Sequence, residues 1–262
     1  MDFTELKLKS ELRQTLSRMN YTTLTPIQER CIPPLLAGES LIAQSRTGSG
    51  KTLAYALPLL EKIRFETFLP QALILVPTRE LALQVKQTLD NVGMYCRTRH
   101  LLLIGRQPFR FQREDLKQRT HVIIATPGRL LQHMQEGTVD LSGLSMLVID
   151  EADEMFRLGF RKSLNAILHR PAAARLLFCH VSRFRHGLPA RAFRRCAQAD
   201  AASPAASGPA EAAFHEGLPP GAPRCAPGCA RFFPIAPLHH VREHDRNSGL
   251  PVRDAAKKRD PM

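Results

Sequence analysis

Short, continuously apolar runs alternate with segments of helical periodicity through the first two thirds of the chain. Helical spacing is present over residues 5–19 and 51–63, and in a segment that ends near Gly38. Apolar strands without polar alternation are typical of a parallel sheet that is buried on both faces. With right-handed crossovers, the pattern predicts an α/β domain whose parallel sheet is covered by helices on both faces. The expected strands are 40–44, 72–76, 100–104, 121–125, 146–150 and 175–178.

This pattern stops after Phe178. Residues 179–262 hold 11 of the 20 prolines but only nine Leu, Ile, Val or Met residues, and they show no regular period. Such a segment cannot bury enough apolar surface to offset the entropy that ordering costs. We therefore expect a folded domain over residues 1–178 and a mostly disordered, low-complexity tail over residues 179–262.

Composition adds a partner and a compartment to this picture. Hydrophobic residues make up 44% of the 262 positions, and the formal net charge is +13. Such a charge favours nucleic acid as a partner, because Lys and Arg release phosphate counterions, although a merely basic surface has the same charge. No apolar run has bilayer-spanning length, and the first 14 residues lack the apolar core of a signal peptide. We therefore expect a cytoplasmic protein, with no membrane contact and with its six cysteines reduced.

A glycine-rich segment joins the expected strand 40–44 to the helix 51–63. It reads Ser45-Arg46-Thr47-Gly48-Ser49-Gly50-Lys51-Thr52, and its strand-to-helix context is that of a phosphate-binding loop rather than of a chance glycine-rich turn. Glycines let backbone N–H groups converge on phosphate oxygens, and the helix N-terminus adds partial positive charge. Lys51 would reach the β- and γ-phosphates, and the Thr52 hydroxyl would bind Mg²⁺. Ser45 replaces the first Gly of the generic pattern, a change that leaves the closing glycine and Lys51 in place.

An acidic group follows the expected strand 146–150 without a gap. Asp150, Glu151 and Asp153 would lie at the carboxyl end of a parallel strand, where open α/β sheets bind their ligands. Asp150 would hold Mg²⁺ through water, and Glu151 would orient or deprotonate the attacking water. An acidic cluster alone is usually a solvated helix start, but together with a phosphate loop it indicates a nucleoside triphosphatase.

The one-letter codes of Asp150-Glu151-Ala152-Asp153 spell DEAD, the sequence after which a family is named. The chain resembles the DEAD-box ATP-dependent RNA helicases over residues 3–178, close to one whole RecA-like P-loop domain, and residues 21–28 resemble the Q motif of that family. The resemblance implies that Gln28 reads adenine, with which a carboxamide can pair bidentately, and that Phe3 stacks on the base. Phe3 as a core anchor of the first helix is the alternative. The implied ATP site comprises Phe3, Tyr21, Thr25, Gln28, Thr47, Gly48, Ser49, Gly50, Lys51 and Thr52. Lys51, Asp150 and Glu151 would be catalytic, and Thr52 and Asp150 would be the Mg²⁺ ligands.

Two further segments resemble the motifs by which this family holds RNA. Residues 77–82 resemble motif Ia and residues 126–129 resemble motif Ib; both follow apolar strands and open helices. Their backbone N–H groups and arginines can therefore meet RNA phosphates, and the resemblance implies single-stranded or duplex RNA bound without sequence preference. Between them, Gly105-Arg106 stands where the family has a Gly-Gly pair, which costs backbone freedom and adds positive charge. The implied RNA-binding residues are Pro77, Thr78, Arg79, Gly105, Thr126, Pro127, Gly128 and Arg129.

The resemblance ends where the family has Ser-Ala-Thr, its motif III. The chain has Cys179-His180-Val181 there, and no later segment resembles the second RecA-like domain with its arginine fingers. Because an arginine finger contributes about three to five orders of magnitude in rate, we expect a poor ATPase and no helicase activity from this chain alone. A nucleotide- and RNA-binding module without hydrolysis, and an interaction protein acting through its basic tail, remain alternatives. Cys225, Cys229, His239 and His240 match no common zinc spacing.

The genetic code supplies a hypothesis for the tail. Codons can be chosen for residues 177–182 whose next reading frame encodes Phe-Ser-Ala-Thr-Phe, which contains the missing motif III. A composition rich in Arg, Ala and Pro, without Lys before Lys257, is also what a GC-rich gene gives out of frame. We therefore expect a frameshift near residues 175–177.

Overall fold

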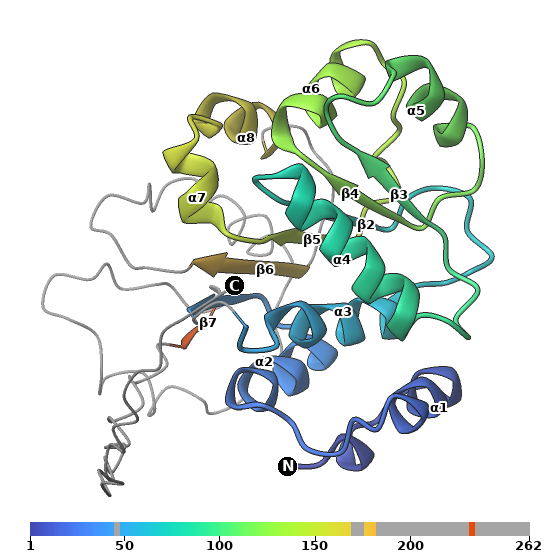
Figure 1. Ribbon diagram of the computed structural model, residues 1–262, viewed down its shortest axis with the longest axis vertical. Helices are drawn as coiled ribbons and strands as arrows, with labels where there is room; N and C mark the ends of the chain where they lie inside the picture. The colour runs from blue at the N-terminus through green and yellow to red at the C-terminus, as the bar shows by residue number, and fades with distance from the viewer. Residues whose placement is uncertain (45–47, 169–175, 182–230, 234–262) are drawn as a thin grey trace, which may run out of the picture.

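A parallel sheet forms the centre of the computed structural model, which describes residues 1–44, 48–168, 176–181 and 231–233. Within these residues the strand order is β3-β4-β2-β5-β6-β1-β7, and each pair of neighbouring strands is parallel (Figure 1). The strands are β1 (Leu41–Gln44), β2 (Ala72–Leu75), β3 (His100–Leu103), β4 (Val122–Ala125), β5 (Met146–Ile149), β6 (Leu176–Val181) and β7 (Arg231–Phe233). The helices are η1 (Phe3–Glu5), α1 (Ser10–Arg18), α2 (Pro26–Ala37), α3 (Lys51–Lys62), α4 (Arg79–Val92), α5 (Phe109–Leu116), α6 (Pro127–Gln135), α7 (Ala152–Arg157) and α8 (Arg161–Leu168).

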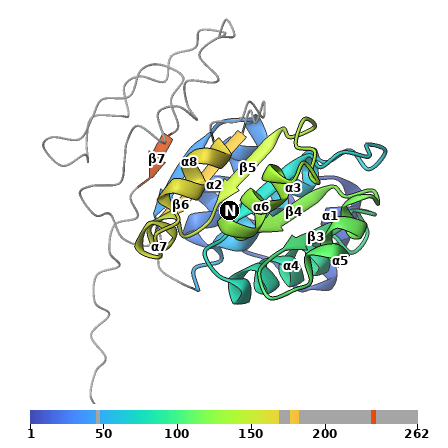
Figure 2. The same cartoon turned by 90° about the horizontal axis from the view of Figure 1, so that it is seen from above.

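Helices cover both faces of the sheet, as the continuous apolar strands predict (Figures 1 and 2). Successive side chains of a strand point to opposite faces, so that Ala72 and Ile74 of β2 pack with α1, α2, α3 and α4. The alternate residues Leu73 and Leu75 pack with α6, α7 and α8. The α/β class and the two-sided cover are therefore confirmed. No helix in the described parts of the chain is long and apolar enough to cross a membrane.

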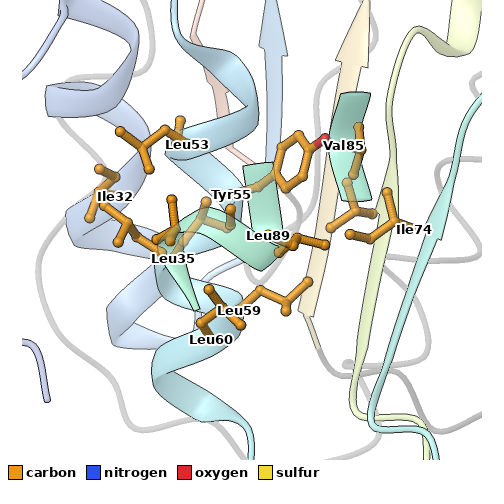
Figure 3. Packing of buried hydrophobic residues seen from close by; sticks show 14 of the residues in the cluster. Ile32, Leu35, Leu53, Tyr55, Leu59, Leu60, Ile74, Val85 and Leu89 are labelled. Atoms are coloured by element: carbon orange, nitrogen blue, oxygen red, sulfur yellow. The ribbon is translucent and has the colours of Figure 1, made fainter. Parts of the chain in front are cut away.

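Helix α3 is the central element of the first layer. Its residues from Leu53 to Leu60 are buried, and it packs against α2 and α4. Figure 3 shows its leucines meeting Ile32 and Leu35 of α2 and Leu89 of α4, with the ring of Tyr55 among them. A helix that is apolar on all sides in this way belongs in a core, and here its first residue is the lysine of the phosphate loop.

The first helix is shorter than the expected 5–19. Residues 3–5 form the 3-10 turn η1, and α1 begins only at Ser10. Between them Leu6 and Leu8 are buried while Lys7 is exposed, which is the alternation of an extended chain. The backbone N–H of Lys9 donates to Glu61 Oε2 of α3 at 2.7 Å instead of to a helical carbonyl. Tertiary contacts therefore override the helical period over these four residues.

The expected strand at 175–178 has different bounds in the structure. It begins at Leu176 and continues through Val181, so its last three residues belong to the segment that the sequence assigned to the tail. Arg231–Phe233 forms β7, which pairs with β1 at the edge of the sheet. The remainder of the tail, including the four candidate zinc ligands, lies outside the described residues, and its disorder stays a prediction.

The register of the strands aligns the candidate site residues at one edge. Leu75 at the end of β2 lies opposite Ala125 of β4 and Ile149 of β5. The next residues continue the ladder, since Asp150 N–H donates to Leu75 O at 2.9 Å and Thr126 N–H donates to Leu103 O at 3.1 Å. The carboxyl end of β1 and the loops after β2, β3, β4 and β5 therefore lie at the same edge of the sheet, as expected for parallel strands.

Candidate functional site

Two glycines with positive φ shape the part of the phosphate loop that the structure describes. Gly48 has φ +78° and Gly50 has φ +87°, and α3 begins at the next residue, Lys51. A Cβ atom on Gly50 would lie 2.5 Å from Gln28 Nε2 and 3.3 Å from Thr25 Oγ1. Both the backbone angle and the close approach therefore require glycine at position 50. Ser45, Arg46 and Thr47 lie outside the described residues.

The residues of the Q-motif segment hold this loop by its backbone. Thr25 Oγ1 donates to Ser49 O at 2.9 Å, and Gln28 Nε2 donates to Gly50 O at 3.1 Å. Gln28 Oε1 in turn accepts from the backbone N–H of Thr25 at 2.9 Å, in the capping box that starts α2. Both polar groups of Gln28 are thus engaged within the protein, and the residue is 4% exposed.

Gln28 keeps some capacity for a base. A carboxamide has two N–H donors and two lone pairs on its oxygen, so one of each remains after the bonds to the loop and to Thr25. That remainder is the donor and acceptor that a bidentate adenine contact uses. The adenine role of Gln28 stays a prediction, and its contact with Gly50 is a second role that the sequence does not reveal.

The rings of the two aromatic candidates lie against each other, with Phe3 buried and Tyr21 exposed. Phe3 is 3% exposed within the first core cluster, and its ring lies 5.8 Å from that of Tyr21, which is 40% exposed. The burial of Phe3 is what its alternative role as a core anchor predicts. Base stacking by either ring stays a prediction.

Lys51 lies in a buried, acidic environment. It is 8% exposed at the first position of α3. Burial lowers the pKa of its ammonium group, because charge is disfavoured away from water, while Asp150, Glu151 and Asp153 each act to raise that pKa. The ammonium group and the three carboxylates are thus close enough to influence one another, as a phosphate loop and its acidic partner require.

Asp150 is connected to the phosphate-loop helix across an intervening strand. The strands β5 and β1 are not neighbours, since β6 lies between them. Nevertheless, the Tyr55 hydroxyl on α3 donates to Asp150 Oδ2 at 3.0 Å, with both residues buried. Sequence reasoning missed Tyr55. Its signal is a hydroxyl-bearing side chain one helical turn after Lys51, in a helix that is otherwise aliphatic there.

Glu151 adopts a left-handed backbone conformation, with φ +52° and ψ +50°, at the N-cap of α7. This region is uncommon for a residue with a side chain and costs about 1–2 kcal/mol, so the surrounding structure must enforce it. The turn sends the chain away from the sheet immediately after Asp150, and leaves Glu151 half-buried beside the edge where the motifs meet.

The donor set of the expected metal site is a hydroxyl and a carboxylate. No group of three or more His, Cys, Asp or Glu side chains with the geometry of a metal site is found in the parts of the chain described by the structure. Mg²⁺ prefers hard oxygen ligands and is usually held by one or two protein groups together with substrate phosphates and water. Thr52 and Asp150, joined through Tyr55, fit that requirement.

The RNA-binding candidates line the other half of the same edge. Thr78 is the N-cap of α4, where its Oγ1 accepts from Leu81 N–H at 3.2 Å. The Nε atom of Arg79 is buried and has no hydrogen-bond partner among the described residues. Its N–H group is therefore available to donate to an acceptor on a bound ligand. Pro127 and Gly128 form the first turn of α6, which Thr126 precedes as N-cap.

Arg129 belongs to a polar network that sequence reasoning missed. Its Nη1 donates to Gln112 Oε1 at 3.3 Å, and its guanidinium lies 5.7 Å from the ring centre of Phe109. Gln112 Oε1 also lies 3.0 Å from Nε2 of the fully buried His133, whose ring stacks on Phe109 at 4.1 Å. The network joins α5 to α6 and orients Arg129.

The loop before α5 contains the expected departure from Gly-Gly. Arg106 has φ +62°, so a residue with a side chain occupies a conformation that favours glycine. A Cβ atom on Gly105 would have no other atom within 4 Å, so space alone does not require glycine there. The backbone cost assigned to Arg106 from the sequence is therefore confirmed.

Comparison with known proteins agrees with this arrangement. The model of the DEAD/DEAH box helicase family matches residues 25–181, which is more than half of the chain. The chain belongs to this family. The family match ends at the last residue of β6, so the helicase resemblance includes the three strand residues that follow Phe178.

Three curated relatives of the helicase family have similar sequences. The ATP-dependent RNA helicase DbpA of Escherichia coli is 46% identical over 166 residues, covering 62% of this chain and 36% of the relative. DbpA of Bacillus subtilis is 42% identical over 170 residues, covering 64% and 36%. The DEAD-box ATP-dependent RNA helicase CshA of Geobacillus kaustophilus is 42% identical over 176 residues, covering 67% and 38%. The chain thus spans little more than a third of the length of these helicases.

Solved structures of the same family share the fold. A DEAD box protein from Methanococcus jannaschii superposes with a TM-score of 0.68 at 31% identity, covering 71% of this chain and 51% of the other. A hypothetical ATP-dependent RNA helicase from Sulfolobus tokodaii gives 0.64 at 30% identity, covering 73% and 54%. The helicase domain therefore has the RecA-like P-loop fold that the motifs predict.

Proposed function

We propose that this chain is the ATP- and RNA-binding domain of an ATP-dependent RNA helicase. The observation that carries the proposal is the bonding of Thr25 and Gln28 to the backbone of the phosphate loop next to Lys51. These bonds join the Q-motif segment to the phosphate loop, so a bound adenine nucleotide would contact both.

The roles of the residues follow from their positions. Lys51 would compensate the charge of the β- and γ-phosphates, and the glycine-rich turn would present backbone N–H groups to the same oxygens. Thr52 and Asp150 would hold Mg²⁺, which when bound neutralises charge on the phosphate oxygens. Glu151 would accept the proton of the attacking water or orient that water.

RNA would bind at the half of the edge formed by β2, β3 and β4. Arg79 has a buried donor without a partner among the described residues, and Arg129 is oriented by Gln112 and Phe109. Contacts of this kind to phosphate oxygens position a strand without reading its bases. We propose that RNA binding is weak and indifferent to sequence. We also propose that this chain alone turns over ATP slowly, because it spans only 36–38% of the length of relatives that are named as ATP-dependent RNA helicases.

Equilibrium binding of Mg²⁺-ATP, followed by RNA-stimulated phosphate release, tests the proposal. The change Lys51→Ala should abolish ATP binding, because it removes the buried ammonium group that would face the phosphates. Lys62→Ala, at the other end of α3, is the matched control and should bind like the unmodified chain.

The outcomes separate the candidate functions. ATP binding with slow, RNA-stimulated turnover supports a helicase domain. Binding of ATP and RNA with no turnover at all identifies a module that does not hydrolyse. Failure of the unmodified chain to bind ATP, or equal binding by Lys51→Ala, would refute the proposed site.

A further inference from the structure

Tyr55 is a hydroxyl-bearing residue in a core that is otherwise aliphatic around it. The residue is 1% exposed, and its ring lies among leucines and isoleucines of α2, α3 and α4 (Figure 3). A phenylalanine would fill the same volume, whereas burying a hydroxyl without hydrogen bonds costs about 1–3 kcal/mol. The hydroxyl therefore requires partners, and it has them at the edge of the cluster nearest the phosphate loop.

These partners are the two expected Mg²⁺ ligands. The Tyr55 hydroxyl donates to Asp150 Oδ2 at 3.0 Å, and it is also hydrogen-bonded to the side chain of Thr52. A tyrosine hydroxyl has a single proton, and in Tyr55 this proton is donated to Asp150. The Thr52 hydroxyl must therefore be the donor in its bond with Tyr55, so the order is Thr52 to Tyr55 to Asp150.

We propose that Tyr55 is a positioning residue that sets the orientation of both magnesium ligands. A hydroxyl that binds a cation through its oxygen keeps its proton, and that proton needs a hydrogen-bond acceptor. Tyr55 Oη is the acceptor for the hydroxyl proton of Thr52. The Tyr55 proton in turn fixes the rotation of the Asp150 carboxylate through Oδ2, and so the direction of Oδ1. Groups that orient metal ligands in this way typically change metal affinity by about 10–100-fold when removed. The inference rests on the proposed function, since it assumes that Thr52 and Asp150 hold Mg²⁺ beside ATP.

The test is the Mg²⁺ dependence of ATP binding by the full chain with Tyr55→Phe. Binding is followed with a fluorescent ATP analogue, first in EDTA and then across a Mg²⁺ titration. The Mg²⁺ concentration at half-maximal enhancement should rise about tenfold, while the affinity in EDTA stays the same. Tyr95→Phe removes the hydroxyl that accepts from Arg18, outside this site, and should leave both quantities unchanged.

A double-mutant cycle with Asp150→Asn shows whether Tyr55 acts through the carboxylate. Coupled residues are non-additive, so Tyr55→Phe should have no further effect on the Mg²⁺ dependence in the Asp150→Asn background. The double variant leaves no buried carboxylate without its donor, so it also shows whether the fold itself tolerates phenylalanine at position 55.

Three results would overturn the inference. An unchanged Mg²⁺ dependence removes the positioning role, and an equal loss of affinity in EDTA and in Mg²⁺ shows a structural role only. Additive effects in the cycle show that Tyr55 does not act through Asp150. By contrast, an unmodified chain that binds no ATP in either condition refutes the proposed function itself, and the inference with it.

Discussion

Single residues at the phosphate loop are held by contacts that leave little freedom for substitution. Gly50 lies against the Gln28 carboxamide, Gln28 bridges Gly50 and Thr25, and Tyr55 connects Thr52 to Asp150. Gln28, Tyr55 and Asp150 are buried polar residues, and the bonds from Gln28 to Gly50 and from Tyr55 to Asp150 join different elements. Removing one member of such a pair leaves a buried polar group unsatisfied, which costs about 1–3 kcal/mol.

The change Gly50→Ala should destabilise the fold and weaken ATP binding. Alanine at φ +87° is strained, and its Cβ would lie 2.5 Å from Gln28 Nε2, so we expect a loss of roughly 2–4 kcal/mol from strain and displacement together. Urea unfolding measures the loss. Gly159→Ala is the control, because Gly159 has φ +82° but open space around the Cβ position. Equal losses in the two variants would show that the contact with Gln28 is unimportant.

Elements follow the apolar pattern of the sequence wherever the pattern is continuous. Strands β2, β4 and β5 lie within the expected ranges, because a short, continuously apolar run is buried on both faces when it forms an inner strand of a parallel sheet. The pattern was wrong for residues 6–9, where alternate leucines pack on the core in an extended chain. The pattern also could not reveal the hydrogen bonds that join Gln112 to His133 and Arg129, because these bonds depend on how α5 packs against α6.

The buried network between α5 and α6 should make the domain sensitive to acid. Burial, and then the charge of Arg129, lower the pKa of His133 from 6.5 to about 4. The unfolded chain therefore binds a proton that the folded chain excludes between these values, so stability is complete above pH 6.5 and falls as the pH decreases toward 4. With about 1.4 kcal/mol per pKa unit, the loss is roughly 3 kcal/mol.

Unfolding free energies measured from pH 7.5 to pH 4 test this expectation. His133→Gln removes the titrating group and is the control, since the change in slope between the two proteins isolates His133 from His100, whose pKa is also lowered by burial. Parallel curves for the two proteins would contradict the assignment.

In the whole molecule, the candidate residues for the two proposed ligands lie along one edge of the sheet. The phosphate loop and Asp150 follow β1 and β5, and the RNA candidates follow β2, β3 and β4. The motifs, their order and the sheet could be predicted because the sequence resembles a family over residues 3–178. The link from Tyr55 to Asp150 across β6 could not, because it depends on where α3 lies over the sheet.

RNA affinity should depend steeply on salt and should be indifferent to sequence. Arg129→Ala removes one phosphate contact, so it should weaken single-stranded RNA binding equally for different sequences and reduce the salt slope by about 0.7. Fluorescence anisotropy at several salt concentrations measures both quantities. Arg18→Ala is the control, because Arg18 bonds Tyr95 away from this edge. Tight binding of one sequence that survives Arg129→Ala would place the RNA site elsewhere.

The residues from Cys179 onward should not be the family's own sequence. Translating the gene through codons 175–182 in the next frame should give Ser-Ala-Thr, followed by a second RecA-like domain, since the code permits that motif at this position. Restoring the frame should then raise RNA-stimulated ATP turnover by about three orders of magnitude or more, because arginine fingers would complete the site. A gene that encodes neither feature in any frame would refute this hypothesis.

Nucleotide selectivity shows whether the Q-motif segment and the phosphate loop act together on one ligand. Calorimetric titration of the unmodified chain and of Gln28→Ala with ATP and with GTP, each with Mg²⁺, gives four affinities. If the Q-motif segment and the phosphate loop form one adenine-nucleotide site, the unmodified chain should bind ATP about tenfold or more tightly than GTP. Gln28→Ala should lose most of that preference while still binding triphosphates. Equal affinities for ATP and GTP in the unmodified chain would show that these segments do not form an adenine-selective site.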